Sequence, residues 1–296
     1  MTLRDLPDFE YLAPKDLREV CRLLQERHGR AKVMAGGTDL LVHMKQRIVI
    51  PQYVIGLKHL SDLEYIEYSE DPGLRIGTLT THQSIAESPI IRERFGALGT
   101  ACSMVGTPQI RSMGTIGGNL CNGSPSSDSA PPLIALNAVV KLLGVEGERI
   151  IPLEAFFVGP GETALLAGEI LTEIQVPSPP LRTGLTFVKL PARTRVDMAA
   201  VSTAVLVTLG LKNQICEDIR IVLGAVAPIP IRAKRAEEVL RGKKIEDELI
   251  QRTAQRASEE AQPISDIRSS ANYRREMVKV LTKQAIKQAL GQAQSA

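Results

Sequence analysis

Two glycine pairs flanked by hydroxyl, amide or carboxylate side chains have the residue types and spacing that suit ligand binding. The first pair lies in Ala35-Gly36-Gly37-Thr38-Asp39-Leu40, between a stretch of strand-forming residues and an apolar helical pattern. Glycines let the backbone approach a ligand closely, and free amide groups before a helix attract an anion such as a diphosphate. Taken alone, a tight turn with Thr38 or Asp39 as the helix cap explains these residues at least as well.

The second pair lies in Thr115-Ile116-Gly117-Gly118-Asn119 and is followed by a polar run that ends at Asp128. Backbone amides in such a segment form concave sites that suit phosphate oxygens. An ordered loop without a ligand is an equal alternative for this pair alone. Two such segments in one chain favour a large ligand that carries phosphate groups.

The sequence lacks the motifs of several common enzyme classes. Gly159-Pro160-Gly161-Glu162-Thr163-Ala164 fits G-x-G-x-x-A, but Pro179-Pro180 stands where a dinucleotide-binding βαβ unit needs a strand ending in an acidic residue. The phosphate loop of nucleotide hydrolases, the G-x-S-x-G elbow and the H-E-x-x-H zinc motif do not occur. The sequence therefore gives no support to a hydrolase.

The cysteines and histidines are scattered along the chain. Cys21, Cys102, Cys121 and Cys216 form no C-x-x-C pair, and the four histidines are equally separated. These spacings predict neither a zinc site nor an iron–sulfur site. Redox chemistry in this chain would therefore need an organic cofactor.

The elements that must position the glycine pairs begin with a predicted αβαβ unit. A helix capped by Asp16 has apolar residues at helical spacing up to His28-Gly29. A strand over 31–35, a second helix from Thr38 to Met44 and a strand over 53–57 follow. The first glycine pair thus joins a strand to a helix.

A second segment, residues 61–176, holds the other glycine pair. Strands are predicted over 65–68, 74–77, 139–143 and 169–176, and helices over 81–87 and 91–100. The intervening stretch, 106–132, is rich in Gly, Ser, Pro and Asn and is predicted to be a long loop.

A linker, Pro177-Ser178-Pro179-Pro180, precedes a third segment. Strands are predicted over 185–189, 199–211 and 216–226, with a hairpin break at Lys212-Asn213-Gln214. Helices close the chain, and the last begins near Ser269-Ser270 with one apolar and one basic face.

The bulk composition is that of an ordinary globular protein, with 44% hydrophobic and 23% charged residues. A net charge of +3 and an aromatic content of 3% disfavour nucleic acid as a partner. The first residues lack the apolar core of a secretory signal, and the longest apolar stretch, 198–211, is shorter than the roughly 20 residues of a membrane span. We expect a cytoplasmic protein with no membrane span.

An ordered set of motifs resembles the FAD-binding medium subunit of the xanthine dehydrogenase and carbon monoxide dehydrogenase family of molybdenum hydroxylases. The two glycine segments match the two FAD loops of that family. Further matches are Gln109-Ile110-Arg111, the run 122–132, the run 157–163, Glu169-Ile170-Leu171, Lys189 with Arg193 and Asp197, the run 226–232 and Tyr273-Arg274-x-x-Met277. The matches span nearly the whole chain.

This resemblance implies an α+β fold with two domains. Residues 1–176 would form a two-subdomain FAD-binding domain of the PCMH type, with subdomains of about 1–57 and 58–176. Residues 181–290 would form a smaller α+β domain, like the C-terminal domain of the carbon monoxide dehydrogenase flavoprotein, with a three-stranded antiparallel sheet and helices.

The resemblance also implies a cofactor site between the two subdomains, with the diphosphate of FAD touching both glycine segments. The implied cofactor-binding residues are Val33, Met34, Ala35, Gly36, Gly37, Thr38, Asp39, Leu40, Val105, Thr115, Ile116, Gly117, Gly118, Asn119, Asp128, Leu171 and Lys189. Lys189 would stabilise negative charge on reduced flavin, and Asp128 would accept from a ribityl or ribose hydroxyl. Val105 is aliphatic where the family often has an aromatic residue, so a stacking contact is not implied there.

The partners implied are a large subunit with the molybdenum cofactor and a small subunit with 2Fe-2S clusters, in a dimer of heterotrimers. This chain would be an oxidoreductase subunit that passes electrons to NAD or another acceptor, with no catalytic acid or base and no metal of its own.

One branch of the family, resembling 4-hydroxybenzoyl-CoA reductase, has an additional iron–sulfur cluster in this subunit. Cys121 has no cysteine neighbours that could bind such a cluster. Alternatives are a stand-alone flavin oxidase or dehydrogenase and a cofactor-less assembly module. The substrate stays open among xanthine, carbon monoxide, nicotinate and aldehydes.

Overall fold

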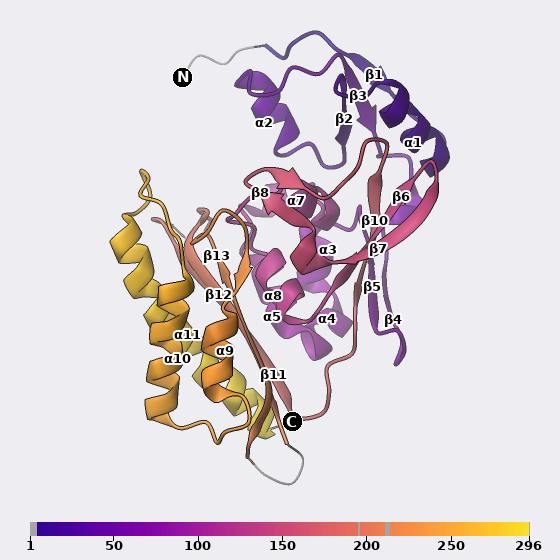
Figure 1. The fold of residues 1–296 in the computed structure, drawn as a ribbon. Helices are drawn as coiled ribbons and strands as arrows, with labels where there is room; N and C mark the ends of the chain where they lie inside the picture. The colour runs from indigo at the N-terminus through magenta and orange to yellow at the C-terminus, as the bar shows by residue number, and fades with distance from the viewer. Residues whose placement is uncertain (1–4, 195, 211–213, 296) are drawn as a thin grey trace.

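The chain folds into three consecutive parts in a computed structural model that describes residues 5–194, 196–210 and 214–295. In Figure 1 the N-terminal part forms a separate lobe, the middle part forms the body below it, and the C-terminal part lies against one side of that body. Both glycine segments face the junction between the lobe and the body. The arrangement is α+β throughout, as predicted.

The N-terminal lobe contains a three-stranded parallel sheet in the order β1-β3-β2. The strands are β1 (Glu10–Leu12), β2 (Ala31–Met34) and β3 (Tyr53–Gly56), and the helices are α1 (Leu17–Glu26) and α2 (Leu40–Lys45). The predicted αβαβ unit therefore lacked its first strand, which is too short to show a pattern. Asp16 caps α1 by accepting from the Glu19 amide, whereas α2 begins at Leu40 and Asp39 makes no capping bond.

The middle part is built on a five-stranded antiparallel sheet in the order β4-β5-β10-β6-β7. Its strands are β4 (Ile66–Tyr68), β5 (Leu74–Gly77), β6 (Val139–Gly144), β7 (Gly147–Pro152) and β10 (Ile170–Val176). The sequence-based assignment omitted β7, which pairs with β6 across a tight hairpin. Helix α3 (His82–Glu87) matches its prediction within a residue.

Two predictions of local structure in the middle part are wrong. The helix expected over 91–100 is two helices, α4 (Pro89–Arg94) and α5 (Gly96–Ser103), because buried Phe95 leaves the helical conformation between them. The expected long loop over 106–132 contains α6 (Pro108–Arg111), α7 (Ile116–Cys121) and the start of α8 (Ala130–Ala135). Thr107 and Thr115 cap the first two helices with their side chains.

The run that formally fits G-x-G-x-x-A forms a small hairpin. Strands β8 (Phe157–Gly159) and β9 (Glu162–Thr163) pair across it, after the short 3-10 helix η2 (Leu153–Ala155). A second 3-10 helix, η1 (Ser61–Leu63), precedes β4.

The C-terminal part has three long antiparallel strands, as expected, and a short fourth. These are β11 (Thr183–Pro191), β12 (Ala199–Leu209), β13 (Cys216–Gly224) and β14 (Ile231–Arg232), in that order. Helices α9 (Lys234–Leu240), α10 (Asp247–Glu260) and α11 (Ala271–Ser295) cover one face of this sheet (Figure 1). Lys212 and Asn213, where a hairpin was predicted, lie outside the described residues.

The other face of this sheet packs on the middle part, so the two share one core. Phe187, Ala204, Leu206 and Val222 belong to the same buried cluster as helices α5 and α8. Alternate residues of β12, such as Val205, pack toward α11 instead. Strand β12 is consequently buried on both faces, which explains its long apolar sequence.

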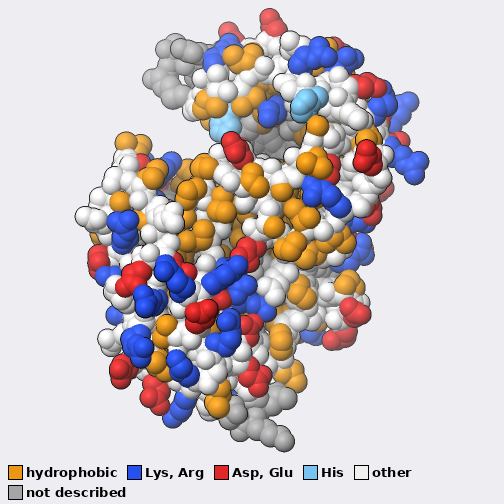
Figure 2. Space-filling view, viewed as in Figure 1, with side chains coloured by type: hydrophobic (Ala, Val, Ile, Leu, Met, Phe, Trp, Pro, Cys, Tyr) orange, Lys and Arg blue, Asp and Glu red, His pale blue; other side chains and the backbone are white. Residues whose placement is uncertain are grey.

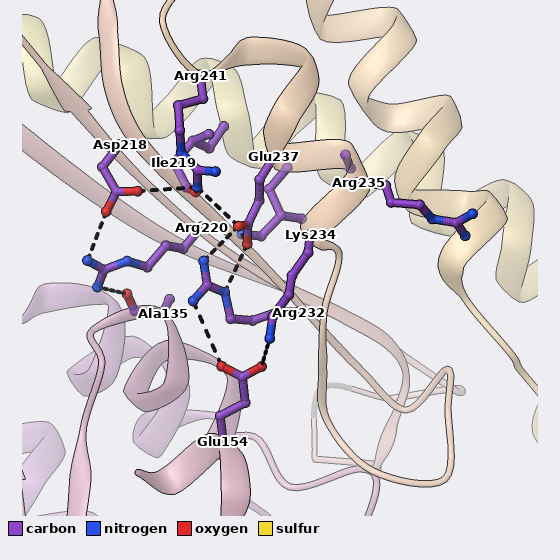
Figure 3. Close-up of polar contacts among 12 residues, drawn as sticks. Ala135, Glu154, Asp218, Ile219, Arg220, Arg232, Lys234, Arg235, Glu237 and Arg241 are labelled. Carbon is purple, nitrogen blue, oxygen red and sulfur yellow. Dashed lines mark hydrogen bonds and ion pairs between the residues drawn. The ribbon is translucent and has the colours of Figure 1, made fainter.

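A charged network reinforces this contact at one edge (Figure 3). Glu154 of the middle part forms ion pairs with Lys234 at 2.7 Å and Arg232 at 3.8 Å. Arg232 also donates to the buried Glu237 carboxylate at 2.6 Å, and Arg220 donates to the Ala135 carbonyl at 2.9 Å. The C-terminal sheet is thus fixed to the body by polar as well as apolar contacts.

Candidate functional site

A cavity of about 650 Å³ lies where the N-terminal lobe meets the body, and both glycine segments line it. Figure 2 shows the molecule hollowed in this place, with apolar side chains along the lower edge. Its volume is within the roughly 300–1,000 Å³ typical of sites for cofactor-sized ligands. All three parts contribute, since residues 196–198 of the C-terminal part also line it.

The first glycine segment lines the cavity and has backbone amides without a hydrogen-bond partner in the part of the chain that the structure describes. The backbone amides of the five residues 36–40 donate no hydrogen bond to any described residue of the chain. All five residues line the cavity. Gly37 has φ +71°, which turns the chain after β2. Gly36 has no room for a side chain, because a Cβ there would lie 1.9 Å from the Met113 carbonyl oxygen. The segment thus packs against the residues before the second glycine pair and leaves its amides open to an anion.

The second glycine segment also lines the cavity, but its amides, unlike those of the first, are bonded within the protein. The amides of Ile116 and Gly117 donate to the carbonyls of Thr80 and Thr78, and the Gly118 amide donates to the Thr115 hydroxyl. These donors are used within the protein, so the expected concave site of free amides is absent at 116–118. Gly117 allows close packing, since a Cβ there would meet the Thr78 hydroxyl at 1.7 Å.

A buried ion pair forms part of the cavity wall. The Lys189 Nζ on β11 donates to Asp128 Oδ2 at 2.6 Å and to the Met104 carbonyl at 3.0 Å, with both side chains less than a tenth exposed. The other carboxylate oxygen, Asp128 Oδ1, is buried and has no partner. Burial raises the pKa of Asp128 to about 6, and the charge of Lys189 limits the rise.

The structure brings together sixteen of the seventeen residues predicted for the cofactor site; each of them lines the cavity. The exception is Ile116, whose side chain is completely buried in the core of the middle part. It follows Thr115 in the matching motif, but it supports the fold of α7 and does not face the cavity.

His82, Cys121 and Met198 line the cavity without having been predicted. His82 is 1% exposed, and burial followed by the charge of Arg111 lowers its pKa to about 4. Burial raises the pKa of Cys121 to about 12, so its thiol stays protonated at neutral pH. A single histidine at the start of a short helix gives no sequence signal, so packing alone reveals it.

The cavity fits a flavin dinucleotide in size and in chemistry. Open amides suit a diphosphate, the unpaired Asp128 oxygen suits a hydroxyl group, and the apolar side chains of Val105 and Leu171 suit a ring system. Residues 7–179 match the family described as FAD binding domain in molybdopterin dehydrogenase, and residues 186–289 match the carbon monoxide dehydrogenase flavoprotein C-terminal domain.

The chain belongs to the FAD-binding medium subunits of the molybdenum hydroxylases. It is 36% identical to the glyceraldehyde dehydrogenase medium chain of Sulfolobus acidocaldarius over 95% of this chain and 98% of that one. It is 34% identical to the carbon monoxide dehydrogenase medium chain of Hydrogenophaga pseudoflava over 95% of this chain and 96% of that one.

A solved carbon monoxide dehydrogenase from the same organism superposes with a TM-score of 0.93 at 34% identity, covering 97% of this chain and 99% of that chain. That enzyme is described as lacking the Mo-pyranopterin moiety of its molybdenum cofactor. Like other medium subunits of this family, the chain is thus an oxidoreductase subunit.

Two further findings concern the described part of this medium subunit. No helix there has both the length and the apolar character that a bilayer span requires. No group of three or more His, Cys, Asp or Glu side chains there is placed to hold a metal ion. The absence of an iron–sulfur cluster stays a prediction, which an iron assay tests.

Proposed function

We propose that this chain holds FAD in the cavity and passes electrons from 2Fe-2S clusters of a partner subunit to NAD or another acceptor. The observation that carries the proposal is the row of unbonded amides at 36–40, in residues that line the same cavity as the buried Lys189–Asp128 pair. An unbonded row of amides is favourable only where an anion or water completes it.

Each part of the cavity has a role in this proposal. The amides of 36–40 hold the diphosphate, and the Asp128 oxygen that lacks a partner accepts from a hydroxyl of the sugar or ribityl chain. The Lys189 ammonium stabilises negative charge near the flavin, while Leu171 and Val105 provide apolar walls. When bound, FAD supplies the ability to take up electrons singly and to release them in pairs.

No residue of this chain has to act as a catalytic acid or base, because water supplies the protons that a flavin takes up on reduction. We propose that the substrate is oxidised on a large subunit with the molybdenum cofactor and that the assembly is a dimer of heterotrimers. We also propose the cytoplasm as its compartment, because all four cysteines are unpaired.

Two rival functions make different use of the same cavity. A stand-alone flavin oxidase needs its own substrate domain, and the C-terminal part contributes mainly residues 189 and 196–198 to the cavity. An assembly module without cofactor does not explain why the amides and the Asp128 oxygen lack partners. The open donors therefore favour a bound cofactor.

Co-purification followed by spectroscopy tests the proposal. We expect the chain, expressed with its neighbouring subunits, to carry one FAD in this subunit, and iron and molybdenum only in the others. Mixing with the substrate in its reduced form should then reduce the iron–sulfur clusters first and the flavin after them. A folded complex without FAD, or substrate oxidation by this chain alone, would contradict it.

A further inference from the structure

His82 is a buried histidine whose ring nitrogen Nδ1 has no hydrogen-bond partner in the described part of the chain. Its side chain is 1% exposed, and its Nδ1 is fully buried. A buried polar group without a partner costs free energy, so native structures rarely keep one unless a water, ion or ligand completes it. His82 also lines the cavity, which offers such a ligand a place.

The position of His82 is fixed by the segments around it. Thr81 caps α3 by accepting from the Ser84 amide and bridges to Thr115, and the His82 amide donates to the Gly114 carbonyl at 3.0 Å. These bonds fix the backbone of His82, and the burial of its side chain leaves the imidazole little room to turn.

The ring lies beside the first glycine segment. A Cβ built on Gly114 would lie 3.4 Å from the Thr38 hydroxyl and 3.6 Å from the His82 ring carbon Cδ2. The imidazole and the Thr38 hydroxyl thus both lie beside Gly114, and Thr38 belongs to the segment 36–40 whose amides have no partner among the described residues. An anion held by the Thr38 amide would therefore lie on the side of the cavity that His82 lines.

The charges around His82 determine what it offers an anion. Arg111 on α6 is the nearby cation, and its guanidinium already donates to Gln83 and to the carbonyls of Val105 and Gly106. Asp39 and His43 line the same cavity from the lobe. With burial and Arg111 disfavouring its charge, the imidazole is neutral at pH 7 and still carries one N–H donor.

We propose that His82 binds the cofactor directly, by donating its ring N–H to an oxygen of the diphosphate held by residues 36–40. The inference rests on the proposed function and adds to the cavity a binding residue from the body, opposite the lobe. The second glycine pair has its amides occupied, so His82 provides a donor on that side that the pair itself does not.

The test measures cofactor affinity and stability of the full chain, reconstituted from its cofactor-free form. Replacing His82 by Leu (H82L) removes the donor, and we expect the Kd for FAD to rise about tenfold or more. ADP, which has the diphosphate but no flavin, should lose affinity in the same proportion. H82Q restores a side-chain donor and should recover part of the affinity.

A matched control is Thr282→Val. Thr282 on α11 also has a buried hydroxyl without a partner, but it does not line the cavity. Removing either unpaired group should leave the cofactor-free chain as stable as wild type or more so, and only H82L should weaken FAD and ADP. Unchanged or higher stability together with weaker binding in H82L would identify His82 as a ligand contact. A purely structural histidine would lower the stability when it is replaced.

The outcomes are distinguishable. If wild type binds FAD and both H82L and H82Q bind FAD and ADP with unchanged Kd, the inference is overturned while the proposed function stands. If correctly folded wild type does not bind FAD, the proposed function fails and the inference fails with it. Should H82L not fold, NMR of labelled wild-type histidine decides: ADP must shift the His82 ring nitrogen signals, and unshifted signals overturn the inference.

Discussion

The Lys189 ammonium and the Asp128 carboxylate are 2.6 Å apart in a nearly solvent-free wall of the cavity between the lobe and the body. Lys189 belongs to the C-terminal sheet and Asp128 to the segment before α8. The pair therefore joins the C-terminal part to the body at the place where the flavin site is expected. Removing one partner leaves the other charge buried without compensation.

Single substitutions of this pair should be more damaging than replacing both residues. We expect Lys189→Met or Asp128→Leu alone to lower the free energy of unfolding by about 3–5 kcal/mol, and the double variant by much less. Both single variants and the double variant should lose FAD, since the cavity then lacks its polar groups. Urea denaturation with FAD quantification measures both effects. Additive stability losses would mean that the pair is not coupled.

Gly36→Ala should separate the two glycine segments. The added Cβ would lie 1.9 Å from the Met113 carbonyl oxygen, so the lobe must shift relative to the body. We expect loss of FAD binding and a drop in stability of about 1–3 kcal/mol. Gly291→Ala on α11 is the matched control, because nothing lies within 4 Å of its added Cβ, and it should be neutral or stabilising. Normal FAD content in the Gly36 variant would refute the close packing of the segments.

The sequence predicted the parts of the fold that repeat a pattern over enough residues. The helix over Leu17–Glu26 and the strands over Ala199–Leu209 and Cys216–Gly224 have clear periodicity or long apolar runs, and they were predicted. Helices α6 and α7 have four and six residues and therefore no periodicity to detect. Strand β1 has three residues, and its pairing with β3 depends on the tertiary fold.

Sequence motifs predicted which segments line the candidate site. They could not predict features that depend on tertiary packing, such as which amides are bonded and which other side chains reach the cavity. Glycine types and spacing indicated both segments, but they do not show which amides are already bonded. Gly37 precedes open amides, whereas the Gly117 amide donates to the Thr78 carbonyl, a residue far away in the sequence. His82 faces the cavity only because distant segments hold it there.

The acid stability of the cofactor-free chain should depend on His82 in a defined direction. Its pKa is lowered to about 4 in the folded chain from an ordinary 6.5, so the unfolded chain takes up the proton first as the pH falls below 6.5. Stability is therefore lost between pH 6.5 and 4, at about 1.4 kcal/mol per pH unit. Asp128, with its pKa raised to about 6, acts oppositely: the folded chain takes up the proton first, so stability is gained from pH 6 down to 3.8.

Comparing variants isolates the histidine contribution. Between pH 7.5 and 5.0, wild type should lose about 2 kcal/mol more stability than H82L does. Denaturant titrations at both pH values measure the difference. An equal pH dependence in the two proteins would show that His82 is not held neutral by burial.

The charged network of Figure 3 should depend on Glu237 far more than on Glu154. The Glu237 side chain is 2% exposed, and its carboxylate accepts from Arg232 at 2.6 Å and from the Ile221 amide at 3.0 Å. Glu237→Leu leaves Arg232 and that amide without their buried acceptor, so we expect a loss of about 3–5 kcal/mol. Glu154→Gln is the control, since Glu154 is 37% exposed and its ion pairs are screened, and it should cost about 1 kcal/mol or less. In this network Glu154 is the residue of the body that pairs with Arg232 and Lys234. If both variants lost the same stability, the contact between the body and the C-terminal part would carry that stability, and the buried Glu237 carboxylate would not.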